Sequence, residues 1–506
     1  ARGQSCVEVN GHGSAALQWK VGLVNYANKY LTAETFGFKV NVTGAALKKK
    51  QIWTLEQDLN EEIVYIKSHL GKYLSTDKYG KISCEAGDDE FDASAKFVIE
   101  YATDGSGKWL FKNVLHRNYL GGTDDNLKCF AKTPTNTEQW TVQLSIHPQV
   151  HLRNVNRRRY AHLHNDEIQC TEVTPWGQDA LIILEFVDGK YALKTCDNRY
   201  LHKNGQLVEN LDNDSLFTLA IKSGQHSGLA FQDSEGRYLT AVGSTASMKG
   251  RNKTITKDEL FTIEDSHPQI VLIAYTGKRV STKQGVDITA NQDEETDNET
   301  FQAEYIHKHE KWAFKTIHNK YWTFDPVTSG VQDKSTEITS ECMFDLEWQG
   351  DGSVALKACN GHYIFNKQTG SLLAQSSTVT DKEKFRVKIV NRPLLVLMSE
   401  HGFVGQKSSS NLEYCCSRAT YNIIFMEANP TGGSYRFKGP NGKFWTVSSE
   451  KTIIPDSDSP VDFIVEFCPD SKLTIKAPNG HYLKGEQNGL FRAVAEDQAS
   501  ATLWEY

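Results

Sequence analysis

A short aromatic motif repeats along the whole chain. Residues 479–483 read Asn-Gly-His-Tyr-Leu and residues 360–364 read Asn-Gly-His-Tyr-Ile. In each copy, polar or basic residues precede a Tyr or another bulky residue, which an apolar or small residue follows. The twelve copies are centred on Tyr30, Tyr73, Tyr119, Tyr160, Tyr200, Tyr238, Val280, Tyr321, Tyr363, Phe403, Phe444 and Tyr482. Successive copies lie 38 to 46 residues apart. Such a period indicates a chain built from repeated supersecondary units.

Each unit contains signals for several short β-strands. Many units end in a short alternating apolar stretch centred on Trp53, Phe97, Trp140, Phe217, Phe261, Phe385 or Trp504. Turn dipeptides such as Asn204-Gly205 and Asn441-Gly442 lie between the expected strands and favour hairpins. Since no long stretch keeps the 3.6-residue period of a helix, the sequence predicts an all-β fold.

The twelve units fall into four groups of three. His147-Pro148 is echoed by His267-Pro268, 120 residues later, and Asn391-Arg392-Pro393 stands about 124 residues further on. A propeller blade also has a period near 40 residues. A propeller needs no grouping by three, however, and the chain lacks the Trp-Asp signature. We therefore predict four tandem β-trefoils at residues 15–147, 148–267, 268–390 and 391–506, after an N-terminal tail at 1–14. No flexible linker separates these blocks, so we expect a stiff body.

The composition argues against several classes of protein. A net charge of −7 gives no general attraction to nucleic acid. No apolar run approaches the ~20 residues that span a bilayer, so we expect no membrane insertion. The ten cysteines form no CxxC pair, and the first residues show no signal-peptide core. A reduced, cytoplasmic protein is the expectation.

The sequence contains no recognisable catalytic constellation. A nucleophile elbow, a P-loop and a dinucleotide-binding glycine motif are all missing. His162 with His164, and His307 with His309, are spaced as weak metal candidates, which we interpret as histidines on solvated strand faces. We predict no enzymatic activity, no cofactor and no metal site.

Basic clusters stand out against the acidic total. They lie at Lys48–Lys50, Arg157–Arg159, Lys249–Lys253 and in the last unit. A charge run is usually a solvated face. On a stiff body, however, separate basic patches can each bind an acidic surface, and two such patches on one molecule would crosslink a polymer.

Several stretches closely resemble the fascin family. Residues 28–40 (Asn-Lys-Tyr-Leu-Thr-Ala-Glu-Thr-Phe-Gly-Phe-Lys-Val), residues 47–57 and 290–296, and the ending Leu-Trp-Glu-Tyr carry the resemblance in one order along the chain. The resemblance implies four β-trefoils. It also implies a monomer that crosslinks actin filaments into the tight parallel bundles of filopodia and similar structures.

The resemblance also implies specific filament contacts. Lys29 and Lys48, Lys49 and Lys50 match an N-terminal basic site. Lys476, Lys484, Glu400 and His401 match positions of the fourth domain near that site. Arg157, Arg158, Arg159 and Lys249 match basic positions of the second domain and suggest a second filament-binding face.

Regulation by phosphorylation is expected to differ from the family pattern. Fascins of vertebrates carry a regulatory serine just before the Leu-Lys-Lys-Lys stretch, and this chain has Ala46 there. Thr43 is the nearby residue that can be phosphorylated. Ser281 matches a second serine with a regulatory role in the family.

A trefoil lectin is the alternative from another class of protein. Many trefoils bind sugars and carry repeated Gln-x-Trp motifs. This chain has Gln139-Trp140 without the intervening residue and shows no repeated version. Strong sugar binding without actin binding would favour the lectin.

Overall fold

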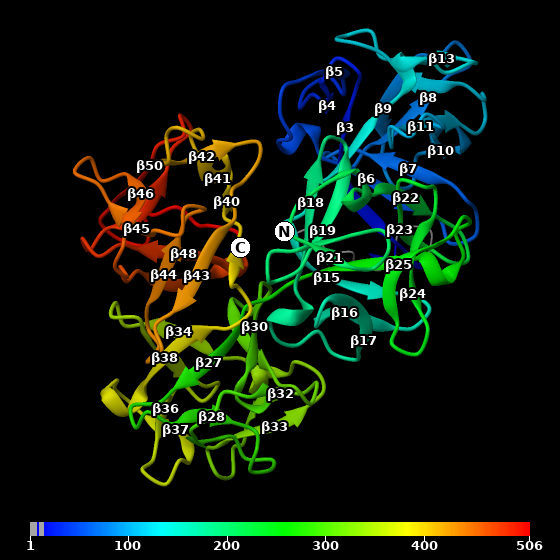
Figure 1. Ribbon diagram of the computed structural model, residues 1–506. Helices are drawn as coiled ribbons and strands as arrows, with labels where there is room; N and C mark the ends of the chain where they lie inside the picture. The colour runs from blue at the N-terminus through cyan, green and yellow to red at the C-terminus, as the bar shows by residue number, and fades with distance from the viewer. Residues whose placement is uncertain (1–7, 10–14) are drawn as a thin grey trace. The chain divides into compact units, whose positions relative to one another are not determined.

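The computed structural model describes residues 8–9 and 15–506 and is built from short antiparallel strands (Figure 1). The chain forms two compact units. The first reaches residue 265 and the second runs from residue 266 to residue 506, except that residues 176–181 belong to the second unit. Each unit contains two β-trefoils, so the predicted fold class is correct.

The first trefoil is a barrel of six strands closed on itself. Strands β3, β6, β7, β10 and β11 pair in that order, β14 pairs with β3, and a bridge between Trp109 and Trp140 joins β11 to β14. The elements are β3 (Gln18–Val24), β4 (Tyr30–Ala33), β5 (Val40–Gly44), η1 (Lys49–Gln51), β6 (Trp53–Gln57), β7 (Val64–Lys67), β8 (Tyr73–Thr76), β9 (Ile82–Ala86), η2 (Ala93–Ala95), β10 (Phe97–Tyr101), β11 (Trp109–Asn113), β12 (Tyr119–Gly121), β13 (Lys128–Ala131), η3 (Asn136–Glu138) and β14 (Thr141–Leu144). The short pair β1 (Glu8–Val9) and β2 (Ala15–Ala16) precedes them.

The second trefoil repeats this plan in the first unit, except that its η4 lies in the stretch 176–181 that belongs to the second unit. Its elements are β15 (Gln149–Asn154), β16 (Arg159–His164), β17 (Glu167–Glu172), η4 (Gln178–Ala180), β18 (Ile182–Val187), β19 (Lys190–Lys194), β20 (Tyr200–Leu201), β21 (Leu207–Val208), η5 (Asn213–Ser215), β22 (Thr218–Lys222), β23 (Gly228–Gln232), β24 (Tyr238–Val242), β25 (Ser247–Asn252), η6 (Lys257–Glu259) and β26 (Phe261–Asp265). A bridge between Tyr191 and Phe217 closes its barrel.

The third trefoil opens the second unit. Its elements are β27 (Gln269–Ile273), β28 (Arg279–Ser281), β29 (Thr289–Gln292), η7 (Asp297–Glu299), β30 (Phe301–Ile306), β31 (Lys311–Lys315), β32 (Tyr321–Phe324), β33 (Val331–Ser335), η8 (Ser340–Cys342), β34 (Asp345–Trp348), β35 (Ser353–Lys357), β36 (Tyr363–Asn366), β37 (Leu372–Ser376), η9 (Asp381–Glu383) and β38 (Lys384–Ile389). Trp312 and Phe344 form the corresponding bridge.

The fourth trefoil is the least regular. Its first barrel strand is split into β39 (Leu394–Leu395) and β40 (Met398–Ser399), and its last is reduced to bridges at Trp504 and Glu505. The other elements are β41 (Gly402–Gln406), β42 (Tyr414–Arg418), β43 (Ile424–Ala428), β44 (Tyr435–Lys438), β45 (Phe444–Val447), β46 (Ile453–Ser457), β47 (Ile464–Cys468), η10 (Pro469–Ser471), β48 (Lys472–Lys476), β49 (Tyr482–Gly485) and β50 (Phe491–Ala495).

The repeated motif is the turn that starts each hairpin. In the first copy, Asn25 N–H donates to Lys29 O and Asn28 holds a φ of 60°, and in the second Gly71 holds a φ of 74° at the same place. Asn and Gly tolerate this left-handed conformation better than other residues, which explains their recurrence before the Tyr. The motif therefore codes for a local backbone geometry.

One copy of the motif is displaced by one residue from the predicted alignment. A β-bulge follows the repeated Tyr in most copies, as between Tyr321 and Trp322. In the seventh copy the bulge lies between Arg279 and Val280. Arg279, and not Val280, therefore occupies the Tyr position. The sequence pattern was misleading there because this copy lacks an aromatic side chain to mark the position.

The repeated Tyr contacts a carboxylate and a cation of the same trefoil. Tyr73 Oη donates to Glu56 Oε2 at 2.8 Å, and Lys67 Nζ lies 5.3 Å from the centre of the Tyr73 ring. Among the described residues, seven copies hold both contacts, with the cation 4.7 to 6.0 Å from the ring. The tyrosines are Tyr73, Tyr119, Tyr160, Tyr200, Tyr321, Tyr363 and Tyr482, bonded to Glu56, Glu100, Glu264, Glu185, Glu304, Glu347 and Glu466. We call this arrangement the Tyr–Glu–cation set.

The barrel interiors are filled by the apolar stretches that end the units. Trp53, Phe97, Trp140, Phe217, Phe261, Phe385 and Trp504 are all fully buried. Trp53 Nε1 donates to Leu31 O at 2.9 Å, which ties the last strand of the first copy to its hairpin. Alternating apolar residues thus close each barrel, as the sequence predicts.

The two trefoils of a unit are joined through a matching tyrosine. In the first unit, Leu144 N–H donates to Tyr191 Oη at 2.7 Å. In the second, Ile389 N–H donates to Tyr435 Oη at 2.9 Å. Buried residues of both trefoils also form one continuous apolar cluster in each unit. Each pair of trefoils is therefore one packed body.

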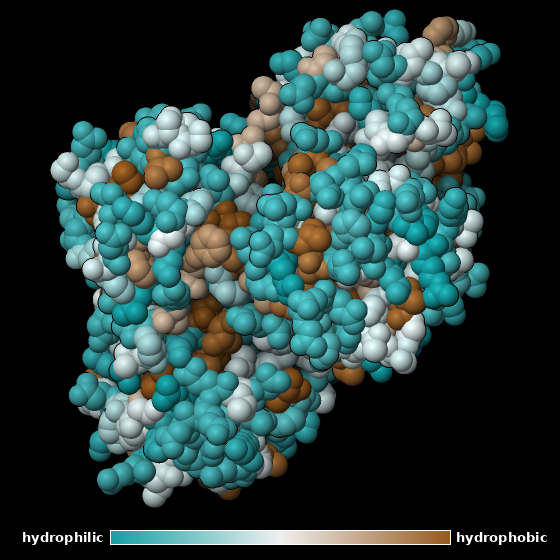
Figure 2. Space-filling model, viewed as in Figure 1, coloured by the Kyte–Doolittle hydropathy of each residue, from teal (hydrophilic) through white to brown (hydrophobic). Residues whose placement is uncertain are grey.

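The face of the molecule in Figure 2 is mainly hydrophilic. Figure 2 shows a face on which polar residues dominate and apolar residues form separate patches. In the part of the chain that the structure describes, no helix has the length and hydropathy needed to cross a bilayer.

Removing one hydroxyl from a buried Tyr–Glu–cation set should destabilise the fold. Glu56 is 1% exposed and Tyr73 is 2% exposed. We expect Tyr73→Phe to lower the free energy of unfolding by about 1–3 kcal/mol, because a buried carboxylate loses its donor. Tyr363→Phe is the matched control, because Tyr363 and Glu347 are only half-buried. Urea denaturation followed by circular dichroism gives both values, and equal losses would contradict the account.

The same tyrosines should make the fold sensitive to alkali. Burial and then the neighbouring carboxylate raise the pKa of Tyr73 and of Tyr160 above the ordinary 10.0. Above pH 10 the unfolded chain therefore binds fewer protons than the folded chain, so the free energy of unfolding falls as the pH rises. We expect the melting temperature to be steady below pH 10 and to drop above it. A melting temperature that stays constant through this range would contradict the assignment.

Candidate functional site

Lys48, Lys49 and Lys50 lie on an exposed turn of the first trefoil. Lys49 and Lys50 begin η1, and all three side chains are exposed. Gln51 fixes this turn from its buried side. Its Oε1 accepts a hydrogen bond from Lys48 N–H at 3.1 Å, and its Nε2 donates to Thr32 Oγ1 at 3.1 Å. The buried Gln51 thus holds the backbone while the three lysines project outward.

Glu34 is a member of this site that the sequence analysis did not identify. Lys50 Nζ lies 3.0 Å from Glu34 Oε2. A hydrogen bond from Asn41, and then the Lys50 ammonium, hold the pKa of Glu34 below its usual range. Glu34 precedes Lys50 by sixteen residues, and no local sequence signal links the two. Lys48 and Lys49 are the more available cations of the turn.

Lys29 and Thr43 lie on the hairpin next to that turn. Lys29 is half-buried in the turn that leads into β4. Thr43 lies in β5, is exposed, and donates its Oγ1 hydrogen to Asn41 Oδ1 at 2.6 Å. The fold therefore leaves Thr43 open to modification.

Arg157, Arg158 and Arg159 form the equivalent hairpin turn of the second trefoil. Asn154 O accepts Arg158 N–H at 2.9 Å, and Arg158 holds a φ of 54°. Arg157 Nη2 donates to Ala241 O at 3.1 Å and is half-buried. Arg158 and Arg159 are exposed. Arg157 thus anchors the turn, and its two neighbours are presented to solvent.

Lys249 lies in the same trefoil, on β25. It lines a groove of about 330 Å³ together with His164, Asp166, Glu167 and neighbouring polar residues. The strand order β16–β17–β25–β24 and the contact from Arg157 to Ala241 bring this strand close to the arginine turn. The structure therefore gathers the predicted residues of the second trefoil on adjacent hairpins.

Glu400 and His401 form the turn between β40 and β41 in the fourth trefoil. Glu400 is exposed, and its Oε1 lies 3.5 Å from His401 Nε2. Ser399 Oγ accepts His401 N–H at 3.2 Å, which fixes the start of the turn. The pair lies at a hairpin turn, as do the arginines of the second trefoil, whereas Lys48–Lys50 lie at η1.

Lys476 and Lys484 differ in their surroundings. Lys476 belongs to a Tyr–Glu–cation set, because its Nζ lies 5.8 Å from the Tyr482 ring, and it also donates to Gly350 O at 3.3 Å. Lys484 is exposed and lies directly opposite Arg492 in the β49–β50 pair. Like charges facing each other across two strands are unfavourable. Arg492 Nη2 already lies 3.4 Å from Glu486 Oε1, so Lys484 is the more available cation of the two for an anionic partner.

The predicted residues therefore form a lysine turn and an arginine turn in the first unit, and lie on two separate hairpins of the fourth trefoil in the second unit. We expect the lysines of the first and fourth trefoils to make one site, and such a site would involve both units. It stays a prediction.

Ser281 is buried, unlike Thr43. Its side chain has no exposed surface, and its Oγ donates to Glu299 Oε2 at 2.5 Å. Thr296 holds the other oxygen of that carboxylate at 2.7 Å. A phosphate at Ser281 would lie next to the buried Glu299 carboxylate and be repelled by it. Phosphorylation therefore requires this part of the trefoil to open. This placement argues against Ser281 as a regulatory site in the folded chain.

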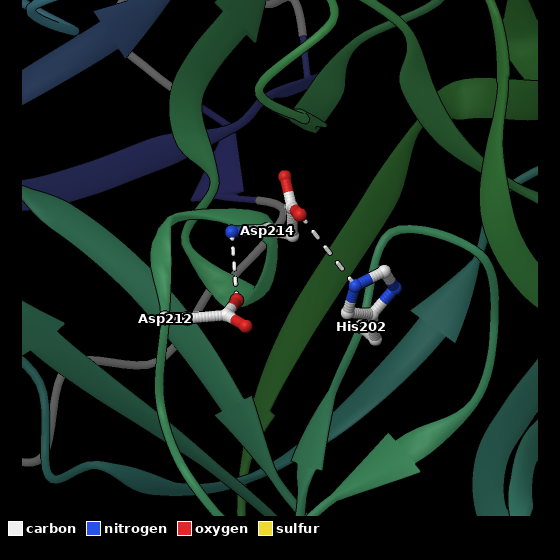
Figure 3. Close-up of side chains that lie close together, drawn as sticks. All are labelled: His202, Asp212 and Asp214. Carbon is white, nitrogen blue, oxygen red and sulfur yellow. Dashed lines mark hydrogen bonds and ion pairs between the residues drawn. The ribbon is translucent and has the colours of Figure 1, made fainter.

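One group of titratable side chains among the described residues has the spacing of a metal site. His202, Asp212 and Asp214 lie close together in the second trefoil (Figure 3). Lys203 Nζ already lies 2.9 Å from Asp214 Oδ1, and Asp212 Oδ1 accepts Asp214 N–H at 2.8 Å. These contacts give both carboxylates a structural role without an ion.

The weak histidine pairs have ordinary surface partners. His162 Nε2 lies 2.7 Å from Thr171 Oγ1, and His307 Nδ1 lies 2.7 Å from Asp470 Oδ1. The prediction of strand-face histidines is correct for His162 and His164 on β16 and wrong for His307 and His309, which lie in the turn between β30 and β31.

Comparison with known proteins gives a consistent result. The family model for the fascin domain matches residues 27–142, 150–263, 275–387 and 400–506. The chain is 42% identical over 496 residues to Fascin-2 of Bos taurus, covering 97% of this chain and 98% of that protein. It is 36% identical over 508 residues to Fascin of Strongylocentrotus purpuratus, covering 97% and 99%. Among solved structures, the designed threefold-symmetric protein ThreeFoil covers 24% of this chain and 96% of its own, with a TM-score of 0.22.

The contrast between the two candidate phosphorylation sites is testable. We expect Ser281→Glu to lower the free energy of unfolding by about 3–5 kcal/mol, because it buries a charge beside Glu299. Thr43→Glu should change it by less than about 0.5 kcal/mol, as is usual at an exposed position. Chemical denaturation of the two variants measures the difference. A Ser281→Glu variant as stable as the original chain would show that this site is open.

Proposed function

The chain belongs to the fascin family, and from this we propose that it binds actin filaments and crosslinks them into tight parallel bundles. One stiff monomer does this through at least two separate surfaces. The first surface consists of Lys29 and Lys48–Lys50. The second consists of Arg157–Arg159 and Lys249. We place the protein in the cytoplasm, in filopodia and other parallel actin bundles, and assign it a structural and not an enzymatic role.

The main support for the proposal is that this acidic chain exposes cations on turns whose backbone is held in place. The chain has a net charge of −7, yet Lys48, Lys49, Arg158 and Arg159 all project from turns whose backbone is fixed by buried or half-buried neighbours. Cations on a rigid scaffold give salt-sensitive contacts of defined orientation with an acidic surface such as that of the actin filament.

The two surfaces of the first unit are held on one packed body. Trp109 Nε1 of the first trefoil donates to Leu219 O of the second at 2.9 Å, and Tyr101 Oη donates to Ile221 O at 2.9 Å. Together with the shared apolar cluster, these contacts limit motion between the trefoils. A bridge with fixed surfaces keeps a constant distance between filaments, which a tight bundle requires.

The fourth trefoil contributes further contacts to the proposal. Lys484 faces Arg492 and is exposed, so it is the better candidate for a direct contact with actin. Lys476 is engaged with Tyr482 and Gly350, so it supports the hairpin as well as adding charge. Glu400 and His401 extend this group. Because Ala46 replaces the usual serine, Thr43 is the proposed point of control by phosphorylation near the first surface.

Charge reversal on one surface should separate bundling from binding. We expect Lys48→Glu/Lys49→Glu to abolish pelleting of actin at low speed, while some of the protein still pellets with filaments at high speed through the second surface. Arg158→Glu/Arg159→Glu should have the same effect. The first pair spares Lys50 and its contact with Glu34, so the turn is expected to keep its shape.

A matched control excludes the effect of net charge. Lys367→Glu/Lys382→Glu makes the same change in charge at two exposed positions of the third trefoil, and Lys382 lies in the equivalent turn η9. This variant should bundle like the original chain. If both surface variants bundle normally, the two surfaces are wrongly assigned. If the original chain does not pellet with actin at all, the proposed function is wrong.

A further inference from the structure

The three hairpins of the first trefoil surround a bowl of about 740 Å³. The hairpins are β4–β5, β8–β9 and β12–β13 (Figure 1). Each contributes one aromatic ring and one lysine to the bowl. These residues are Phe38 and Lys39, Tyr79 and Lys81, and Phe130 and Lys128. Residues from three separate parts of the sequence therefore form one basic and aromatic surface.

The aromatic rings are unusually open to solvent. Tyr79 is 71% exposed, Phe130 is 64% exposed and Phe38 is 43% exposed. Phe36, on the same hairpin as Phe38, is 85% exposed. Single exposed apolar residues are common, but a group of aromatic rings around one hollow marks an interaction site.

The backbone holds the bowl in place without a partner. Val42 N–H donates to Asp124 O at 2.8 Å, and Cys129 N–H donates to Gly80 O at 2.9 Å, so the three hairpins are tied to one another. Phe38 holds a φ of 51°, an unfavourable value for a bulky residue. Strain of this kind collects at functional sites. The rings are thus pre-organised, which reduces the loss of entropy on binding.

Folding of a trefoil does not require such a bowl. In the second trefoil the corresponding groove is lined by polar and charged residues of its hairpins, such as Asp166, Gln206 and Lys249, and by no Phe, Tyr or Trp. In the hairpin loops of the third trefoil, the large apolar residues exposed in the described structure are Val286 and Val327. The group of aromatic rings therefore distinguishes the first trefoil from the second and the third.

The charges around the bowl favour an acidic partner. Its lining holds three lysines against Glu85 and Asp125. Two more lysines lie near the rings. Lys72 Nζ is 5.7 Å from the centre of the Phe38 ring, and Lys78 Nζ is 5.0 Å from the centre of the Tyr79 ring. An apolar side chain flanked by carboxylates fits this combination.

The hairpin that carries Phe38 also contacts the lysine turn. Glu34 directly follows β4 in the hairpin that carries Phe38, and its Oε2 lies 3.0 Å from Lys50 Nζ. Gln51 Nε2 donates to Thr32 on the same hairpin at 3.1 Å. We propose that the bowl is the apolar anchor of the first filament-binding surface and receives an apolar side chain from an acidic segment of actin. This inference rests on the proposed function.

The bowl and the lysines should contribute different parts of the affinity. Lysine contacts weaken as salt rises, whereas burial of aromatic rings is largely insensitive to moderate salt. The bowl would therefore supply the binding that persists at high ionic strength. It would also give the first surface a specificity for shape that charge alone does not provide.

The test is co-sedimentation with actin over a series of KCl concentrations. We expect Tyr79→Ser/Phe130→Ser to weaken binding by roughly tenfold at every salt concentration, which is a large effect for an interface. The slope of log Kd against log salt should stay unchanged. Lys48→Glu/Lys49→Glu should reduce that slope. Val286→Ser/Val327→Ser is the matched control, and thermal melting checks that each variant is folded.

The outcomes separate this inference from the proposed function. If the original chain binds and bundles actin but Tyr79→Ser/Phe130→Ser binds equally well, the anchor is refuted and the proposed function stands. If the original chain does not bind actin, both are refuted. If the variant binds actin normally but no longer pellets with vesicles of phosphatidylcholine and phosphatidylserine, the bowl is a membrane-binding site and the actin anchor is refuted.

Discussion

The fold depends on a single polar arrangement that recurs in the hairpins. A Tyr at the start of the second strand donates to a Glu on a neighbouring barrel strand, and a Lys or Arg lies over its ring, as in Tyr73 with Glu56 and Lys67. The β-bulge next to the Tyr turns the hairpin away from the barrel. Where the set is present, it fixes the hairpin relative to the barrel, whose interior apolar residues fill. In the described part of the chain, seven of the twelve copies keep it in full.

This arrangement also explains where the candidate binding residues lie. Lys29 and Arg159 each precede the repeated Tyr of their hairpin, Lys476 is itself the cation of a set, and Lys484 follows Tyr482 by two residues. The hairpin turns are exposed, their backbone is fixed, and each trefoil presents three of them. The same scaffold can therefore carry basic residues on one hairpin, aromatic rings on another and neutral residues on a third without a change in the barrel.

Periodicity made the fold predictable, because the period near 40 residues and the grouping by three follow directly from the order of residues. Local burial was less predictable. Ser281 lies in a basic segment, which favours an exposed position, yet it is buried and its Oγ donates to Glu299, eighteen residues away. Glu34 and the aromatic bowl depend on contacts between hairpins that are distant in the sequence. The carboxylate partners of the repeated tyrosines could not be identified without the strand register.

Cryo-electron microscopy of bundles formed by the purified chain would test the central claim most directly. The account predicts that each bridge between two filaments contains one chain. One filament should contact the turn of Lys48–Lys50, and the other should contact the turn of Arg157–Arg159. A bridge made of two chains, each touching only one filament, would contradict the proposal of a stiff monomer with two binding surfaces.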